Sequence, residues 1–129
     1  MTAETILLVD DEASVRSYIR NILRREGFQV LEGVDGVDAL QQVERHQSPV
    51  DLLVTDIRMP RMDGLALARS VNEKFPATPI LYISGFPFDL EEERTLHPAT
   101  VCAFLAKPFS RQTLVEAVRK CLSRARHTA

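Results

Sequence analysis

The sequence lacks an excess of charge of either sign. It has 16 basic and 18 acidic residues, which gives a formal net charge of -2 at pH 7. A domain that binds nucleic acid through the phosphate backbone usually carries a clear basic excess. The composition therefore gives no general attraction to nucleic acid, and we expect the chain not to bind it directly.

Long hydrophobic runs are also missing. The longest apolar stretch, VCAFLA at 101–106, is far shorter than the roughly 20 residues that a membrane-spanning helix needs. The first residues, MTAETILLVDDE, have neither the basic start nor the long apolar core of a secretory signal peptide. These features predict a protein that does not associate with a membrane and that works in the cytoplasm.

Cysteine is scarce. The two cysteines, Cys102 and Cys121, lie in apolar patterns and have no metal-ligand spacing. We expect both to pack in the core. Because buried thiols without partners are typical of proteins kept in a reducing environment, the pair also favours a cytosolic compartment.

What the sequence does have is the composition of one ordinary globular domain. Of its 129 residues, 45% are hydrophobic and 26% are charged. We expect a single domain over residues 1–129, with its core at about 4–124. The polar residues 125–129 are expected to form a frayed tail.

Two hydrophobic periods alternate along the chain. Short apolar runs predict buried strands, and apolar residues three or four positions apart predict helices. The expected strands lie at 5–9, 28–31, 50–56, 79–85 and 100–108. The expected helices lie at 12–26, from 35 or 36 onward, at 64–74, at 87–96 (short and mobile), and from the N-cap Ser110 onward. This alternation predicts a doubly wound α/β fold, in which helices cover both faces of a parallel sheet.

Polar residues stand where four of these strands end. Asp10 and Asp11 follow the first strand, and Asp56 ends the third. Ser84 and Lys107 stand at the ends of the fourth and fifth strands. In open parallel sheets the carboxyl ends of the strands lie at one edge, where ligands bind. We therefore expect three carboxylates, one hydroxyl and one amine to converge at that edge.

The chemistry of these groups points to phosphoryl transfer. Neighbouring carboxylates disfavour each other's ionised form unless a cation is present. Because no histidine or cysteine accompanies them, the ligand set favours a hard ion, Mg²⁺ or Mn²⁺. Lys107 and Ser84 are suited to binding phosphoryl oxygens. Asp56 is placed to act as a nucleophile toward phosphorus, which would give an aspartyl phosphate.

Four stretches of sequence occur in a fixed order. They are LLVDDE at 7–12, DLLVTDIRMPRMDG at 51–64, ISG at 83–85 and FLAKPF at 104–109. Each is weakly specific alone, but together they closely resemble the receiver domain of two-component response regulators, and the match covers nearly the whole chain. The resemblance implies a flavodoxin-like, three-layer (βα)5 fold with a five-stranded parallel sheet in the order 2-1-3-4-5.

The resemblance also implies a role for each of the acidic residues. Asp56 would be the phosphoacceptor, and Asp10 and Asp11 the acidic pair that serves Mg²⁺ together with Asp56. The backbone carbonyl of Arg58 would be a further metal ligand. The peptide bond before Pro108 is usually cis in this family.

The same resemblance implies a switch beside the phosphoacceptor. Ser84 would be the switching hydroxyl, Lys107 the phosphate-binding lysine, and Phe104 the aromatic switch residue. Arg58 and Phe86 would flank the phosphoryl group and tune the lifetime of the aspartyl phosphate. Phe86 would do so by excluding water, and Arg58 by pairing with the phosphate or with a neighbouring acid.

A receiver domain accepts its phosphoryl group from a histidine kinase or from a histidine phosphotransfer domain. Phosphorylation would then change the face formed by the fourth helix, the fifth strand and the fifth helix. That face would contact a downstream protein, a fused output domain or, in a phosphorylation-dependent homodimer, a second copy. As a module, the domain would catalyse only its own phosphorylation and dephosphorylation. It is expected to be a stand-alone regulator or part of a longer regulator or hybrid histidine kinase.

Two alternatives from other functional classes remain at this point. The first is a Mg²⁺-dependent phosphohydrolase of the haloacid-dehalogenase type, which also forms an aspartyl phosphate. Such enzymes place a general acid two residues after the nucleophile, where this chain has Arg58. The second is a pseudo-receiver that is never phosphorylated and serves as an interaction scaffold. The intact set of acids, hydroxyl and lysine argues against it.

Overall fold

The structure, a computed structural model, describes residues 3–46, 48–85 and 100–128, with side chains described up to residue 125. Phe86 and the helix expected at 87–96 lie outside these ranges. The elements are β1 (Thr5–Val9), α1 (Ala13–Arg25), β2 (Gln29–Gly33), α2 (Gly36–His46), β3 (Leu52–Asp56), α3 (Gly64–Lys74), β4 (Ile80–Ser84), β5 (Val101–Ala106) and α5 (Arg111–Thr128).

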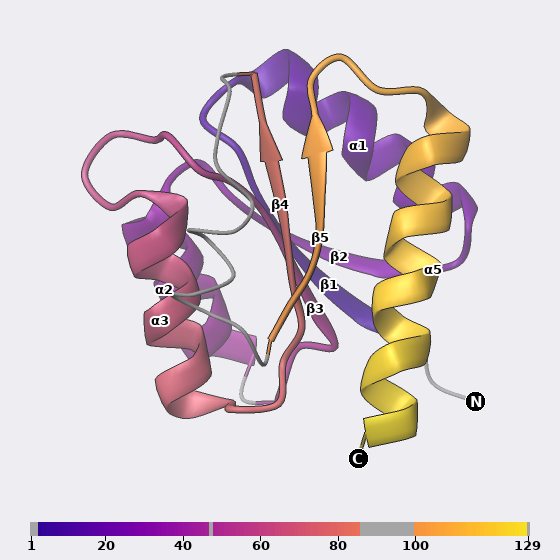
Figure 1. The fold of residues 1–129 in the computed structure, drawn as a ribbon. Coiled ribbons are helices and arrows are strands. Elements are labelled where there is room, and N and C mark those ends of the chain that lie inside the picture. The colour runs from indigo at the N-terminus through magenta and orange to yellow at the C-terminus, as the bar shows by residue number, and fades with distance from the viewer. Residues whose placement is uncertain (1–2, 47, 86–99, 129) are drawn as a thin grey trace.

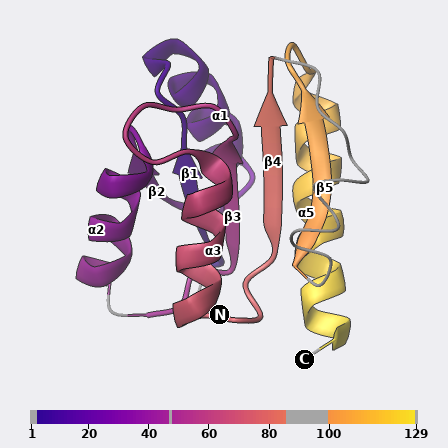
Figure 2. The ribbon, with the colours of Figure 1, turned by 60° about the vertical axis from the view of Figure 1, so that its left-hand side comes forward.

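The five strands form one parallel sheet in the order β2-β1-β3-β4-β5. Helices α1 and α5 cover one face of the sheet, and α2 and α3 cover the other (Figures 1 and 2). The doubly wound fold and the strand order predicted from the sequence are therefore confirmed. Because all strands run in the same direction, their carboxyl ends lie along a single edge of the sheet.

The core has two halves, one on each face of the sheet. Strands β1, β3 and β4 are buried along their whole length. In β1, Ile6 and Leu8 face α1 and α5, whereas Leu7 and Val9 face α2 and α3. Burial on both faces explains why the sequence of this strand is continuously apolar. Burial on both faces also fixes the central strands in place, so the residues that follow them have well-defined positions.

Some element boundaries differ from those predicted. Strand β2 extends to Gly33 because it pairs with β1 along that strand's full length, up to the Val9–Gly33 pair. The hydroxyl of Ser110 accepts a 3.1 Å hydrogen bond from the Thr113 backbone N–H, which confirms the predicted N-cap of α5. Helix α5 continues through Thr128, past the expected end of the core at residue 124. Arginine and alanine, which favour helices, fill much of that extension.

The two cysteines are joined to each other. Cys102 in β5 and Cys121 in α5 form a disulfide, with their Cα atoms 5.4 Å apart, which is within the usual range for such bonds. Both side chains are buried, so the predicted packing in the core is confirmed. The expectation of free thiols was wrong, however, and the cysteines no longer support a reducing compartment.

A β-bulge in β5 explains how the pairing arises. Val101 and Ala103 pair with consecutive residues of β4, which leaves Cys102 as an extra residue between them. Regular alternation would place Cys102 on the face opposite to its neighbour Ala103. The bulge instead turns Cys102 into the core beneath α1 and α5, where Cys121 lies. A register shift of this kind is not visible in the sequence pattern.

Reducing this disulfide in the wild-type protein is expected to lower the free energy of unfolding by about 3 kcal/mol. The bond joins residues 19 positions apart, so it removes many conformations from the unfolded chain. Denaturant titration with and without a dithiol reductant measures the change. A Cys102→Ala, Cys121→Ala double variant is the control, because the reductant must leave its midpoint unchanged. Equal midpoints for oxidised and reduced wild type would contradict the expectation.

Candidate functional site

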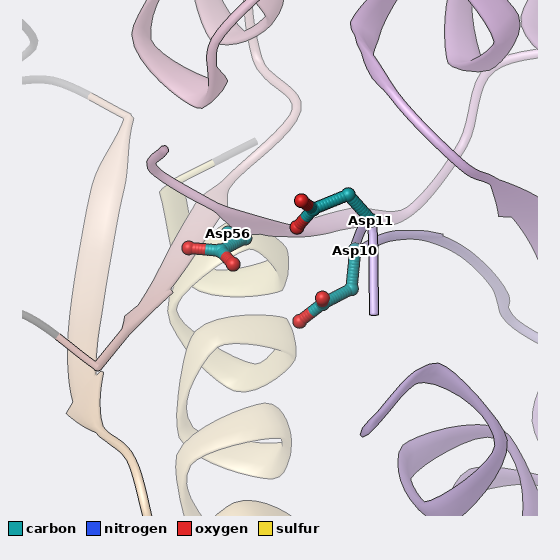
Figure 3. A group of neighbouring side chains, drawn as sticks. All are labelled: Asp10, Asp11 and Asp56. Carbon is teal, nitrogen blue, oxygen red and sulfur yellow. The ribbon is translucent and has the colours of Figure 1, made fainter. Parts of the chain in front are cut away.

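Three carboxylates meet at the carboxyl edge of the sheet. Asp10 and Asp11 directly follow β1, and Asp56 is the last residue of the neighbouring β3. One oxygen from each side chain lies within 4.8 Å of the others. Figure 3 shows the three carboxylates gathered around a common space. Asp10 and Asp56 are buried, whereas Asp11 is exposed. The predicted convergence of the three carboxylates is therefore confirmed.

Lys107 enters this cluster from the end of β5. Its Nζ lies 3.0 Å from Asp10 Oδ2 and donates a 3.0 Å hydrogen bond to Asp56 Oδ2. The contact with Asp10 is an ion pair without hydrogen-bond alignment, because Asp10 Oδ2 has no hydrogen-bond partner. One ammonium thus bridges two buried carboxylates, and three acids beside one lysine leave an excess of negative charge.

Glu12 also belongs to the cluster, although no role for it was predicted from the sequence. Its Oε1 lies 3.6 Å from Lys107 Nζ, and its backbone N–H donates a 2.8 Å hydrogen bond to Asp10 Oδ1. Glu12 is the N-cap residue of α1, so the start of that helix orients the Asp10 carboxylate. Its position directly after Asp10 and Asp11 in the sequence was the available signal.

The electrostatics of the site are set by burial and by the lysine. Burial raises the pKa of Asp10, and the Asp56 charge adds to this effect. The Glu12 N–H and Lys107 act in the opposite direction without cancelling the increase in pKa. For Lys107, burial alone would lower the pKa, but contacts with Asp10 and Asp56 outweigh it, so the pKa is raised. Lys107 is therefore held as a cation, while the ionised form of Asp10 is disfavoured.

The residues present fit a Mg²⁺ or Mn²⁺ ion. The donor set of Asp10, Asp11 and Asp56 consists of oxygens only, which suits a hard cation. Asp10 Oδ2 is a buried acceptor that makes no hydrogen bond, although Lys107 Nζ lies 3.0 Å away, and it is therefore available as a ligand to a metal ion. Added positive charge would also offset the burial that raises the pKa of Asp10. The chemistry of the cluster thus supports the predicted metal, with Arg58 as the remaining predicted ligand.

Two of the other predicted site residues, Ser84 and Arg58, form hydrogen bonds with residues of this cluster. Ser84 is buried at the end of β4, and its carbonyl accepts a 2.8 Å hydrogen bond from the Lys107 N–H. Phe104 in β5 is partly buried, with its ring centroid 5.5 Å from that of Tyr82. The Arg58 backbone N–H donates a 3.4 Å hydrogen bond to Asp56 Oδ1.

The backbone around Lys107 also matches an expectation of the sequence analysis. The peptide bond between Lys107 and Pro108 is cis. The structure therefore brings Asp10, Asp11, Asp56, Ser84 and Lys107 together at one edge, whereas Phe86 lies outside the described residues.

Comparison with solved structures defines the class of fold. The chain superposes on the crystal structure of a CheY-like response regulator receiver domain protein from Methanospirillum hungatei JF-1 with a TM-score of 0.87. The match covers 99% of this chain and 100% of that chain at 23% sequence identity. The protein therefore has the CheY-like, flavodoxin-like α/β fold.

Sequence comparison gives the family. Residues 6–119 match the family described as response regulator receiver domain. Sensor kinase CckA of Brucella abortus (strain 2308) is 36% identical over 120 residues, which cover 93% of this chain. Response regulator receiver protein CpdR of the same strain is 33% identical over 117 residues, covering 91% of this chain and 95% of CpdR. The chain belongs to the response regulator receiver domain family, and its acidic pocket is consistent with phosphoacceptor signalling.

The lengths of the relatives differ widely. The chain spans 13% of CckA and 58% of the transcriptional regulatory protein PdtaR of Mycobacterium tuberculosis, but nearly all of CpdR. Receiver domains of this family thus occur both within much longer proteins and nearly alone. Among the described residues, no helix is both long enough and apolar enough to cross a membrane.

Proposed function

We propose that this domain accepts a phosphoryl group on Asp56 from a phosphohistidine of a histidine kinase or phosphotransfer domain. One Asp56 carboxylate oxygen bonds to phosphorus while the bond from phosphorus to the donor's imidazole nitrogen breaks. The imidazole leaves with the electron pair of that bond. The observation that carries the proposal is the buried Asp56 carboxylate held 3.0 Å from Lys107 Nζ among three clustered acids.

The remaining residues of the site have distinct roles in this reaction. Lys107 offsets negative charge on the phosphoryl oxygens, and its donation to Asp56 keeps the carboxylate oriented. Asp10, Asp11 and Asp56, with the backbone carbonyl of Arg58, would hold Mg²⁺. When bound, Mg²⁺ supplies positive charge that stabilises the transferring group. Arg58 and Phe86 tune the lifetime of the product.

Phosphorylation changes the charge at the end of β3, and Ser84 and Phe104 respond to it. The Ser84 hydroxyl moves toward the phosphoryl oxygens, and the Phe104 ring turns further inward from β5. The equilibrium between inactive and active conformations shifts as a result. We propose that the face expected from the receiver resemblance, formed by the helix expected at 87–96 together with β5 and α5, then changes its affinity for a downstream partner.

The wider context is also a proposal. The likeness to sensor kinase CckA supports a receiver within a hybrid histidine kinase, and the likeness to CpdR supports a stand-alone regulator. In either case, the module catalyses only its own phosphorylation and dephosphorylation. We place it in the cytoplasm on the basis of its family alone, because the cysteines no longer support that location.

Beryllofluoride, a mimic of the phosphoryl group, tests this function. Adding it with Mg²⁺ is expected to shift the amide resonances of Asp56, Ser84 and Lys107, because these groups would contact the mimic. The shifts should extend to Phe104 if the switch operates. Beryllofluoride with a chelator in place of Mg²⁺ is the control and should give no such change. Absence of shifts at Asp56 in the presence of Mg²⁺ would overturn the proposed function.

A further inference from the structure

The loop between β3 and α3, residues 57–63, contains a strained turn. The N–H of Met62 donates a 2.8 Å hydrogen bond to the carbonyl of Pro60, two residues earlier. Arg61, between them, has a φ of 67°, and it is the one positive-φ residue other than glycine in the described part of the chain. A turn of this kind, closed around a positive φ, is rare and strained.

An ion pair connects the strained residue to a different part of the protein. Arg61 Nε and Nη2 lie 2.7 and 2.6 Å from the same oxygen, Oδ2, of Asp35. Asp35 stands just before α2, and its other oxygen accepts a 2.9 Å hydrogen bond from the Asp38 N–H. The Asp35 side chain is only 7% exposed, so the guanidinium is attached to a fixed group rather than to a mobile surface acid.

A second contact supports the same connection. A Cβ atom added to Gly36 would collide with the side chain of Met62, the residue after Arg61. The backbone at the start of α2 therefore fits closely against the loop at two adjacent positions. The pKa of Asp35 is also held below its ordinary value, first by the Asp38 N–H and then, against the effect of burial, by Arg61.

The loop in turn touches the reacting carboxylate. The N–H of Arg58 donates its hydrogen bond to Asp56 Oδ1, and the loop closes where the Gly64 N–H donates a 2.8 Å hydrogen bond to the Ile57 carbonyl. A change of φ at Arg61 would move the short segment between these points. It would therefore shift the Arg58 backbone relative to Asp56.

We propose, on the basis of the proposed function, that Arg61 and Asp35 are positioning residues for the Asp56 site. Their ion pair holds the strained turn and thereby keeps the Arg58 backbone in place beside the Asp56 carboxylate. The two residues act from the loop tip, by restricting the conformation of residues 57–63.

Two substitutions remove the ion pair in different ways. Arg61→Ala keeps a residue that disfavours positive φ, so the turn is expected to relax toward negative φ. Asp35→Asn removes the charge but keeps a side-chain oxygen that can accept from Asp38, so the start of α2 is retained. Both variants are expected to weaken Mg²⁺ binding by about tenfold, the lower end of the range for residues that support a metal site indirectly.

Two further variants separate strain, charge and stability. Arg61→Gly also loses the ion pair, but glycine adopts positive φ without cost, so it should retain more affinity for Mg²⁺ than Arg61→Ala. Arg119→Ala is the matched control, since Arg119 forms a similarly exposed ion pair with Glu26 far from the site. Its affinity for Mg²⁺ should equal that of the wild type.

The measurement is a titration of each folded variant with Mg²⁺ alone, followed by the amide resonance of Asp56, together with a metal-free denaturation curve. Weaker binding in Arg61→Ala and Asp35→Asn, with unchanged binding in Arg119→Ala, supports the inference. Lower denaturation midpoints with wild-type Mg²⁺ affinity would show a purely structural ion pair and overturn it, leaving the proposed function intact. A wild-type protein that does not bind Mg²⁺ would overturn both.

Discussion

Asp56→Asn is expected to abolish phosphoryl uptake from a small phosphodonor such as acetyl phosphate in the presence of Mg²⁺. Asparagine has nearly the shape of aspartate, but its amide offers no anionic oxygen to attack phosphorus. The substitution also removes one of the three negative charges that would attract the metal. Because Asp56 is buried beside Lys107 at the end of the central strand β3, no other acid among the described residues has the same position. Intact-protein mass spectrometry after incubation with the phosphodonor measures the uptake.

Asp63→Asn is the matched control for this experiment. Asp63 is the N-cap of α3, where its side chain accepts a 2.9 Å hydrogen bond from the Ala66 N–H. Asparagine can accept the same bond, so the fold should be kept and phosphoryl uptake should match the wild type. Undiminished uptake by Asp56→Asn would contradict the assignment of the phosphoacceptor. Loss of uptake in both variants would instead indicate an effect of the substitution on the loop between β3 and α3.

Gly64→Ala is expected to destabilise the protein by about 4 kcal/mol or more. Gly64 begins α3 directly against the end of β3, and a Cβ atom there would overlap the backbone carbonyl oxygen of Asp56. The obstacle is main chain in a buried strand, so it cannot rotate away as a flexible side chain would. Much of the total stability of a domain of this size would be lost. Chemical denaturation followed by circular dichroism measures the effect.

Gly85→Ala provides the comparison, because the nearest atom to an added Cβ there is Lys107 Cδ at an ordinary contact distance of 3.9 Å. Gly85→Ala should change the free energy of unfolding by much less than Gly64→Ala does. Equal stability of the two variants would show that the backbone at Asp56 can yield to the added methyl group. Any folded fraction of Gly64→Ala should also show a displaced Asp56 amide resonance.

Much of the site could be predicted from the sequence because parallel strands end at one edge. Asp10 follows the apolar run ILLV, and Asp56 follows LLV and one threonine. Short runs of this kind are typical of strands buried on both faces. Once those strands are placed side by side, their terminal residues must be neighbours. The position of Lys107 after the last apolar run follows in the same way. The local sequence was therefore enough to predict that Asp10, Asp56 and Lys107 lie close together.

Other features depend on contacts that no local pattern reports. Arg61 and Asp35 are 26 positions apart, and an arginine gives no sign that its φ will be positive. The pairing of Cys102 with Cys121 depends on the bulge in β5, where Cys102 is the extra residue. The bulge places the Cys102 side chain on the face of the sheet that α5 covers. These are properties of register and backbone conformation, and they emerge only after the elements have packed.

The disulfide gives the last part of the chain a covalent topology of its own. Residues 102–121 form a closed macrocycle that contains Phe104, Lys107 and the first turns of α5. A protease that cuts one peptide bond inside this ring opens the ring but releases no fragment. After such a cut, Lys107, which donates a hydrogen bond to Asp56 in the folded protein, thus stays covalently connected to α5 for as long as the disulfide remains oxidised, even when the surrounding fold is lost.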